Sequence, residues 1–345
     1  MQLLLNKKFR IFFIVSVLIS SSLFSLQFGD GTDEDSLIPV KVMDEVTSVS
    51  ALLPYNTLVI KSDKSLWATG YNAGKYLNID TVGDINKFVK IMDNVKSVSG
   101  NSIIKEDGSL WQLNEDGLKK IDDDVIKVAY GWDAIMYIKM DNSLWAFGKD
   151  YYGMFGLGIE RSISEKPVKL KNNIIDVFCN SIYSLIVTKD HELYISGSHY
   201  LPDPYKSPTY SFIKVAEEVR SVAEGFYITK ENQLYAFGFS AHGALGIGDT
   251  KKDVLPIKIM DDVKKVSSSQ TYTFILKFDG SLYGSGGRSP NYFGALGTGN
   301  LKPLFYPTLI QRNVSDISAG SHHSAFIKED GSLWMSGANS YPPLL

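Results

Sequence analysis

The side chains that could do nucleophilic or acid–base chemistry are few among the 345 residues. There are five histidines and one cysteine, Cys179, which follows the apolar residues Val177 and Phe178. Such a cysteine is more typical of a packed core than of a nucleophile, and alone it forms neither an internal disulfide nor a multi-cysteine zinc site. The residues of a serine–histidine–acid triad come together in space, so their spacing along the sequence neither reveals nor excludes a triad. The Gly-x-Ser-x-Gly elbow that presents a nucleophilic serine is absent.

Paired acidic residues are the other candidates for catalysis. Asp122-Asp123-Asp124, Glu217-Glu218 and Asp261-Asp262 each stand just before a Val-x-x-Val type string. A glycosidase needs two carboxyl groups about 5–10 Å apart across a bound sugar, and nothing selects such a pair here. Recurrence at one point of a repeat favours solvated turns, and the acids are not spaced like a calcium-binding loop. The sequence therefore predicts no catalytic residues, no metal and no cofactor, with a lyase or glycosidase as an alternative.

One dipeptide organises the chain, namely leucine followed by tryptophan or tyrosine. It recurs at intervals of about 45 residues, which is the period of a repeat protein. Each copy follows a short polar turn such as Asp107-Gly108, for which we expect a two-residue type I′ hairpin. The seven copies are Leu66-Trp67, Leu110-Trp111, Leu144-Trp145, Leu193-Tyr194, Leu234-Tyr235, Leu282-Tyr283 and Leu333-Trp334.

Two further strands are expected in each repeat. One carries a string such as Val263-Lys264-Lys265-Val266, and the other contains lysine, as in Val168-Lys169-Leu170. Four short strands in about 45 residues are the pattern of one propeller blade. Outside the N-terminal segment, no stretch has the sustained apolar period of a helix. The predicted fold is therefore all-β: a seven-bladed β-propeller with four antiparallel strands per blade.

Three glycine-rich strings carry a family resemblance. Gly153–Gly158, Gly243–Gly248 and Gly294–Gly299 resemble the Gly-x-Leu-Gly-x-Gly signature of the regulator of chromosome condensation repeat, a resemblance that covers all seven units. It implies that the Val-x-x-Val strand is innermost in each blade and the lysine-bearing strand outermost. The chain then starts and stops in mid-blade. We therefore expect the strand at 37–43 to close the ring by completing the last blade of a propeller that spans 37–345.

The N-terminal segment is expected to be a targeting signal rather than part of the fold. Lys7, Lys8 and Arg10 precede the apolar stretch Ile11–Leu18, which is shorter than the roughly 20 residues of a membrane-spanning helix. We predict a signal peptide over residues 1–25, with an uncleaved anchor as the alternative. Residues 26–36 are then a short polar lead-in, and the mature protein has no stable membrane span. The predicted location is extracellular, or periplasmic and associated with the cell envelope.

The strand order sorts the loops onto two faces. Hairpin turns and links between blades share one face. The loops after each Leu-aromatic strand share the other face with the short loops that hold Trp132, Phe226 and Tyr272. Exposed aromatics gathered on one face are typical of a recognition surface. The residues that we predict to bind a partner are Trp132, Tyr152, Tyr200, Tyr205 and Tyr292.

These observations favour a binding protein over an enzyme. We expect a monomeric, exported, non-catalytic module that recognises a protein or a cell-surface polymer. The formal net charge of −3 argues against a nucleic-acid partner held through its phosphates. One precedent within the resemblance is the secreted propeller, with similarly short blades, that inhibits β-lactamase through aromatic loops. The alternative from the same family is a guanine-nucleotide exchange factor for a small GTPase, against which the acidic charge and the predicted signal count.

Overall fold

The computed structural model describes residues 27–53, 56–72, 76–80, 83–114, 117–199, 208–240, 242–248, 254–287 and 293–339. The predicted signal peptide and the candidate residues Tyr200, Tyr205 and Tyr292 lie outside these described residues. Within them, no helix has the length and apolar character that crossing a bilayer requires.

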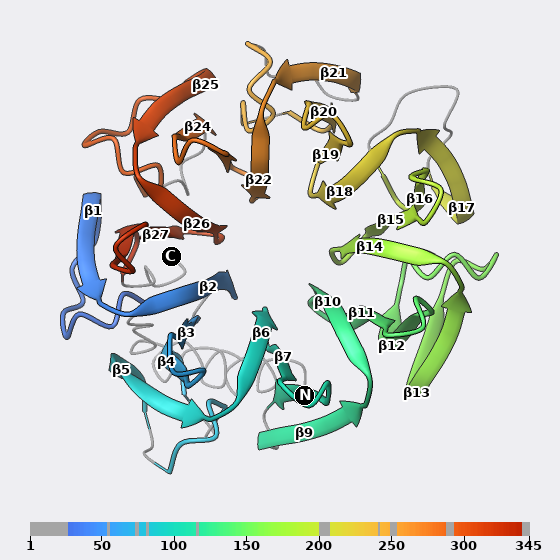
Figure 1. The fold of residues 1–345 in the computed structure, drawn as a ribbon, viewed down its shortest axis with the longest axis horizontal. Helices are drawn as coiled ribbons and strands as arrows, with labels where there is room; N and C mark the ends of the chain where they lie inside the picture. Colours follow the sequence, from blue (N-terminus) through green and yellow to red (C-terminus); the bar gives the residue numbers. More distant parts are fainter. Residues whose placement is uncertain are drawn as a thin grey trace, which may run out of the picture.

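The strands form a ring of seven four-stranded antiparallel sheets, so the predicted propeller is confirmed (Figure 1). The first sheet contains β2 (Val46–Leu53), β3 (Asn56–Lys61), β4 (Leu66–Gly70) and β5 (Ile85–Met92), paired in that order. As expected, the Val-x-x-Val type strand lies nearest the ring axis in every blade. The lysine-bearing strand lies at the rim, except in the sixth blade, whose rim strand has no lysine.

The next five blades repeat this order along the chain. Their strands are β6 (Val95–Ser99), β7 (Ser102–Lys105), β8 (Leu110–Asn114) and β9 (Gly117–Asp122); β10 (Val125–Gly131), β11 (Ala134–Lys139), β12 (Leu144–Asp150) and β13 (Ser162–Lys171); β14 (Ile174–Cys179), β15 (Tyr183–Thr188), β16 (Leu193–Gly197) and β17 (Thr209–Ala216); β18 (Val219–Ala223), β19 (Phe226–Thr229), β20 (Leu234–Gly238) and β21 (Val254–Met260); and β22 (Val263–Ser268), β23 (Tyr272–Lys277), β24 (Leu282–Gly286) and β25 (Leu304–Gln311).

The seventh blade joins the two ends of the fold. It contains β26 (Val314–Ala319), β27 (His323–Lys328), β28 (Leu333–Gly337) and, at the rim, β1 (Ser36–Met43). Val40 pairs with Met335 and Lys41 with Trp334 in antiparallel register. Figure 1 places the blue N-terminal strand against the red C-terminal blade. The predicted closure of the ring by the N-terminal strand is therefore confirmed.

The core lies between neighbouring blades, because each blade buries both faces of its sheet. The leucine of the repeated pair is fully buried, as at Leu144, while the aromatic beside it is half-buried on the opposite side of the strand. One cluster joins Met136 and Ile138 of the third blade to Ile174 and Val177 of the fourth. A repeat of one leucine every 45 residues or so thus marks one hydrophobic layer per blade.

The hairpin turns differ from the type I′ expectation. The N–H of Lys61 donates to the carbonyl of Ser65, and the N–H of Lys64 donates to the carbonyl of Lys61, both at 3.0 Å. The loop therefore has three residues, and only its last one, Lys64, has a positive φ, of 66°. This is a type I turn followed by a left-handed residue. The Asp63 carboxylate selects it by accepting the N–H of Ser65 at 2.9 Å.

Glycine motifs fill the gaps between blades near the rim. At Gly156, with φ of 68°, a Cβ atom would lie 2.4 Å from the ring of Phe212 in the next blade. The Ser196 hydroxyl of that blade donates to the carbonyl of Gly153 at 2.7 Å. The motif therefore connects adjacent blades through backbone that approaches too closely for any side chain.

The segment before β1 differs from the polar lead-in that we expected. Phe28 is fully buried and packs with Val46, Phe88 and Met335 between the seventh and first blades. Gly29 has a φ of 69°, and a Cβ there would clash with Phe88 at 2.6 Å. Residues 28–31, Phe-Gly-Asp-Gly, thus form a further glycine motif at the closing gap. Composition concealed it, because only one of its four residues is apolar.

Candidate functional site

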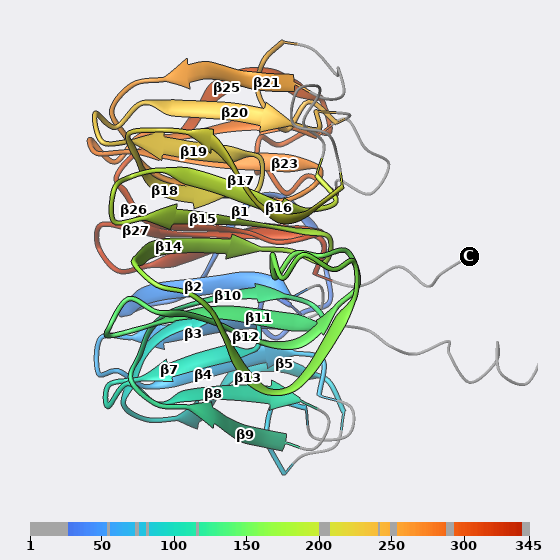
Figure 2. The ribbon, with the colours of Figure 1, turned by 90° about the vertical axis from the view of Figure 1, so that its right-hand side faces the viewer.

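The long-loop face is the candidate site, and we use that name for the blade ends that carry the loops after each third strand and the short loops between the first and second strands. Figure 2 shows the blades edge-on, with β14 running towards this face and β15 running back from it. Of the predicted partner-binding residues, Trp132 and Tyr152 fall within the described chain, and both lie on this face.

Trp132 is held outwards by a strained loop. It stands between β10 and β11 with 58% of its surface exposed and a φ of 60°. A bulky residue in the left-handed region costs on the order of 1–3 kcal/mol and is a reason to suspect function. The neighbouring Asp133 carbonyl accepts the N–H of Lys149 at 2.8 Å, which fixes the loop against β12. The indole therefore faces solvent from a loop that is hydrogen-bonded to β12.

The loop after β12 adds two tyrosines to the same blade. Tyr151 and Tyr152 are exposed by 37% and 43%. Behind them the buried carboxylate of Asp150 accepts three backbone N–H groups, from Tyr152 at 3.1 Å, Met154 at 2.9 Å and Phe155 at 3.0 Å. The third blade thus presents three aromatic side chains on an ordered loop framework.

Other aromatics that sequence reasoning counted on this face belong to the core. Phe226 and Tyr272 open the strands β19 and β23 and are fully buried. The Tyr272 hydroxyl donates to the carbonyl of His323 at 2.8 Å. From its position beside a short loop alone, an exposed aromatic side chain cannot be told from one that packs between blades. The aromatic surface is therefore smaller than the sequence predicts and is concentrated, within the described residues, in the third blade.

A cavity of about 140 Å³ opens on the long-loop face between the fourth, fifth and sixth blades. Its polar lining comes from three short loops and two longer ones, and its apolar lining from aromatic and aliphatic side chains. Asn180 donates from Nδ2 to the Glu224 carboxylate at 3.2 Å and accepts the N–H groups of Ile182 and Tyr183 at 2.9 Å. The polar residues that line it are Asn180, His199, Glu224, His242, Ser268, Ser269 and Gln270.

Burial shifts the pKa of two groups that line the cavity, Glu224 and His199. Desolvation raises the pKa of Glu224 to about 7, against a hydrogen bond from Asn180 that favours the charged form. Burial also lowers the pKa of His199 to about 4, so its ring is neutral above that pH. Sequence reasoning missed this site because its residues come from blades about 45 positions apart. Aligning the short loop of each repeat would have placed Asn180, Glu224 and Ser269 together.

The cavity and the exposed indole are neighbours on the face. Gly131, which precedes Trp132, approaches the fourth blade so closely that a Cβ atom there would lie 2.7 Å from the Asn180 carbonyl. The short loop of the third blade therefore abuts the loop that donates to Glu224.

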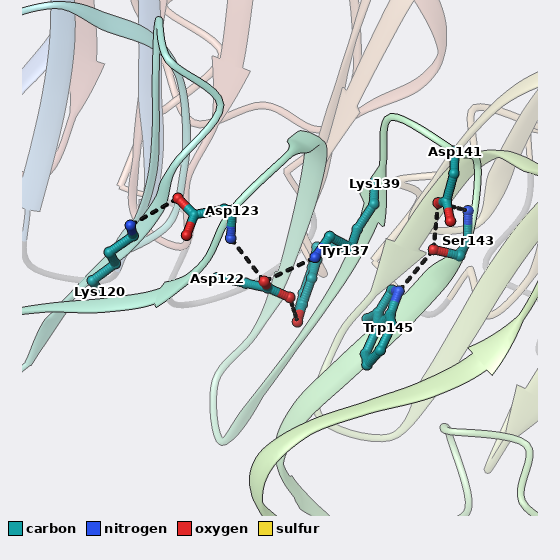
Figure 3. Close-up of polar contacts among 8 residues, drawn as sticks. All are labelled: Lys120, Asp122, Asp123, Tyr137, Lys139, Asp141, Ser143 and Trp145. Carbon is teal, nitrogen blue, oxygen red and sulfur yellow. Dashed lines mark hydrogen bonds and ion pairs between the residues drawn. The ribbon is translucent and has the colours of Figure 1, made fainter.

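The paired acids form structural turns, as the sequence indicates. Asp124, Glu218 and Asp262 have φ near 60°, as second residues of the links between blades. The acid before each pairs with a rim lysine three positions back, as in Lys120–Asp123 at 2.8 Å (Figure 3).

Asp122, at the end of β9, is held by the neighbouring third blade. Its carboxylate accepts hydrogen bonds from Tyr137 at 2.7 Å and Lys139 at 2.9 Å (Figure 3). Burial opposes ionisation, but these donors outweigh it and lower the pKa of Asp122. No three histidine, cysteine or acidic side chains of the described chain gather as metal ligands do.

The remaining reactive groups are enclosed. Cys179 is buried, as expected, and desolvation raises the pKa of its thiol to about 12. His323 is fully buried, with Nε2 2.9 Å from the Thr57 hydroxyl of the first blade, and desolvation lowers its pKa to about 3. Neither group reaches a surface where a substrate could meet it.

Comparison with known proteins shows which repeat family the sequence resembles. Models of the regulator of chromosome condensation (RCC1) repeat match residues 231–276, 279–327 and 314–341, in the last three blades. The chain is 23% identical over 240 residues to the ultraviolet-B receptor UVR8 of Arabidopsis thaliana, covering 63% of this chain and 54% of the receptor. It is 23% identical over 248 residues to the regulator of chromosome condensation of Xenopus laevis, covering 60% and 58%. The chain thus spans little more than half the length of these curated relatives.

Solved structures agree on the fold. Human WBSCR16 superposes with a TM-score of 0.70 at 17% identity, over 88% of this chain and 90% of that one. Prp20p of Saccharomyces cerevisiae, described with its binding to Gsp1p and histones, gives a TM-score of 0.68 at 15% identity, over 86% and 83%. The fold and the loop face define a seven-bladed β-propeller. The last three blades of this propeller match the RCC1 repeat in sequence.

Proposed function

We propose that this protein is an exported, bacterial-type, non-catalytic binding module whose long-loop face recognises a protein or a cell-surface polymer. The observation that carries the proposal is Trp132, which is 58% exposed on a backbone held at a φ of 60°. Exposed aromatics on a rigid support are the side chains that most often dominate binding energy. Export rests on the basic and apolar N-terminal pattern of the sequence.

A capture experiment tests this proposal. The mature chain is immobilised and exposed to culture supernatant and to a cell-envelope extract, beside the Trp132→Asn and Asp190→Lys variants. A specific partner should be retained by the wild-type protein and by Asp190→Lys, which alters the opposite face, and lost from Trp132→Asn. A partner that all three proteins retain equally would contradict a role for the long-loop face.

Nucleotide exchange on a small GTPase is the alternative function. It is supported by the RCC1-repeat match and by the similarity to the Xenopus laevis regulator. Accelerated release of a fluorescent guanine nucleotide from a small GTPase, with no partner captured outside the cytoplasm, would favour it over the binding module.

A further inference from the structure

The half-buried Glu224 accepts fewer hydrogen bonds than the buried carboxylates Asp150 and Asp176. Asp150 accepts three backbone N–H groups, and Asp176 pairs with Lys127 and accepts the N–H of Val222 at 3.0 Å. Glu224 accepts one hydrogen bond, from the Asn180 amide, and no lysine or arginine of the described chain pairs with it. A carboxylate that is partly withdrawn from water and held by one neutral donor is stabilised by a cation that reaches it.

The walls of the cavity suit the rest of such a ligand. Tyr183, Phe237 and Phe239 line it together with Ile182 and Leu245. Aromatic faces attract cations, and the apolar walls accommodate an alkyl chain. The volume of about 140 Å³ holds several water molecules, each occupying about 30 Å³ in the liquid, and so admits a short alkyl chain with one charged end. An anion would instead be repelled by the Glu224 carboxylate.

We propose that this cavity is a binding site for an alkylammonium group, with Glu224 as the counter-ion, Asn180 orienting the carboxylate, and the aromatic walls holding the alkyl chain. The group is either the side chain of a lysine on a partner or a free primary amine. The site stands on its own contacts, so it does not depend on whether the long-loop face binds a macromolecule.

The test measures binding of two cationic probes to the full mature chain by calorimetry. One is n-butylammonium, with n-butanol as its neutral counterpart. The other is N-acetyl-lysine amide, with N-acetyl-norleucine amide as its neutral counterpart. We expect at least one of the two cations to bind, and to bind at least tenfold more tightly than its neutral counterpart. Binding of n-butylammonium alone would identify a free amine as the ligand, and binding of capped lysine would identify a partner's side chain.

Variants distinguish the site from general surface charge. Glu224→Gln should lower the affinity for the bound cation at least tenfold, and Glu224→Asp should retain part of it. Glu160→Gln removes an exposed carboxylate from a loop of the same face and should leave the affinity unchanged. Cooperative melting of each variant checks that it is folded. Equal binding of cation and neutral counterpart, or unchanged binding by Glu224→Gln, would overturn the proposal.

The pH dependence is a second readout. Affinity should fall as the pH is lowered from 8 to 6, because the Glu224 carboxyl, with a pKa near 7, becomes protonated. The other titratable groups that line the cavity are His199, His242 and Tyr183. His242→Gln should leave the pH profile unchanged, and a profile abolished by His242→Gln but kept by Glu224→Gln would contradict the assignment. If the wild-type protein binds neither cationic probe but still captures a partner in a Trp132-dependent way, the cavity proposal is wrong and the proposed function stands.

Discussion

The side-chain oxygen of Asn339 accepts the backbone N–H of Phe28 at 2.8 Å, across 311 positions of sequence. The same asparagine donates its backbone N–H to Asp35 at 2.8 Å and its Nδ2 to the carbonyl of Thr32 at 2.9 Å. One buried residue after β28 thus organises the whole segment before β1, and the ring closes through this contact as well as through strand pairing.

Phe28→Ala should destabilise the propeller by about 3–5 kcal/mol, because it empties a site between the first and seventh blades. The free energy of unfolding is measured in urea. Glu34→Ala, an exposed change in the same segment, should alter it by less than about 0.5 kcal/mol. Equal midpoints for both variants would show that residues 27–35 do not support the ring.

Ser143→Ala should cost about 1–2 kcal/mol of unfolding free energy. The Ser143 hydroxyl donates to Asp141 at 2.5 Å and accepts the indole N–H of Trp145 at 2.7 Å (Figure 3). Ser65→Ala removes the matching hydroxyl in the first blade, where it accepts the Trp67 N–H at 2.8 Å, and should cost a similar amount. If neither variant shifts the urea midpoint, the hydrogen bonds that join the tryptophan, the serine and the aspartate contribute nothing to stability.

Trp132→Asn should weaken partner binding by at least about 2 kcal/mol, roughly thirtyfold. It should leave the stability unchanged or raise it by about 1 kcal/mol, since asparagine tolerates a positive φ. Titration calorimetry and urea unfolding measure the two effects. Charge reversal at Asp107, Asp190 or Asp330 should change the affinity little. Parallel loss of affinity and stability in Trp132→Asn would mean that this tryptophan is structural.

Stability should fall as the pH drops from about 6.5 towards 3, because unfolded chains protonate His323 while the folded protein, with a pKa near 3, does not. The loss is on the order of 4 kcal/mol over this range. His199, with a pKa near 4, acts in the same direction. His323→Gln should flatten the plot of unfolding free energy against pH. A variant with the slope of the wild type would locate the acid sensitivity elsewhere.

Glu224 should change the pH dependence of stability in the opposite direction. Its pKa is raised from 4.5 to about 7, so the folded protein holds a proton that the unfolded chain releases, and stability falls as the pH rises through this window. Glu224→Gln should therefore be more stable than the wild type at pH 8, by about 2–3 kcal/mol, and similar to it at pH 5. Glu160→Gln should match the wild type at both values. Equal urea midpoints for Glu224→Gln and wild type at pH 8 would contradict the shift.

The blade count and strand order could be predicted because they are local and repeated. Leu66, Leu144 and Leu333 occupy equivalent buried positions, so one dipeptide marks each hydrophobic layer. The turn type could not be read from Asp-Gly pairs, because the Asp63 hydrogen bond to Ser65 selects a three-residue loop.

The candidate site was harder to predict than the fold. The exposure of Trp132 and Tyr152 could be predicted because aromatic side chains are conspicuous in polar loops, but Phe226 and Tyr272 look the same in sequence and are buried. Glu224 and Asn180 meet across two blades, and no local pattern brings together residues separated by 44 positions. Their proximity depends on the angle between adjacent blades.

The pairing of β1 with β28 also sets the order in which the molecule can assemble. During synthesis the strand made first must wait for the strand made last, and until then its hydrogen-bonding edge has no partner. Contacts between such distant residues slow folding, because a long loop must close before they form. For this propeller the closing step thus requires both β1 and β28, and a copy that lacks either strand retains an open edge that invites aggregation.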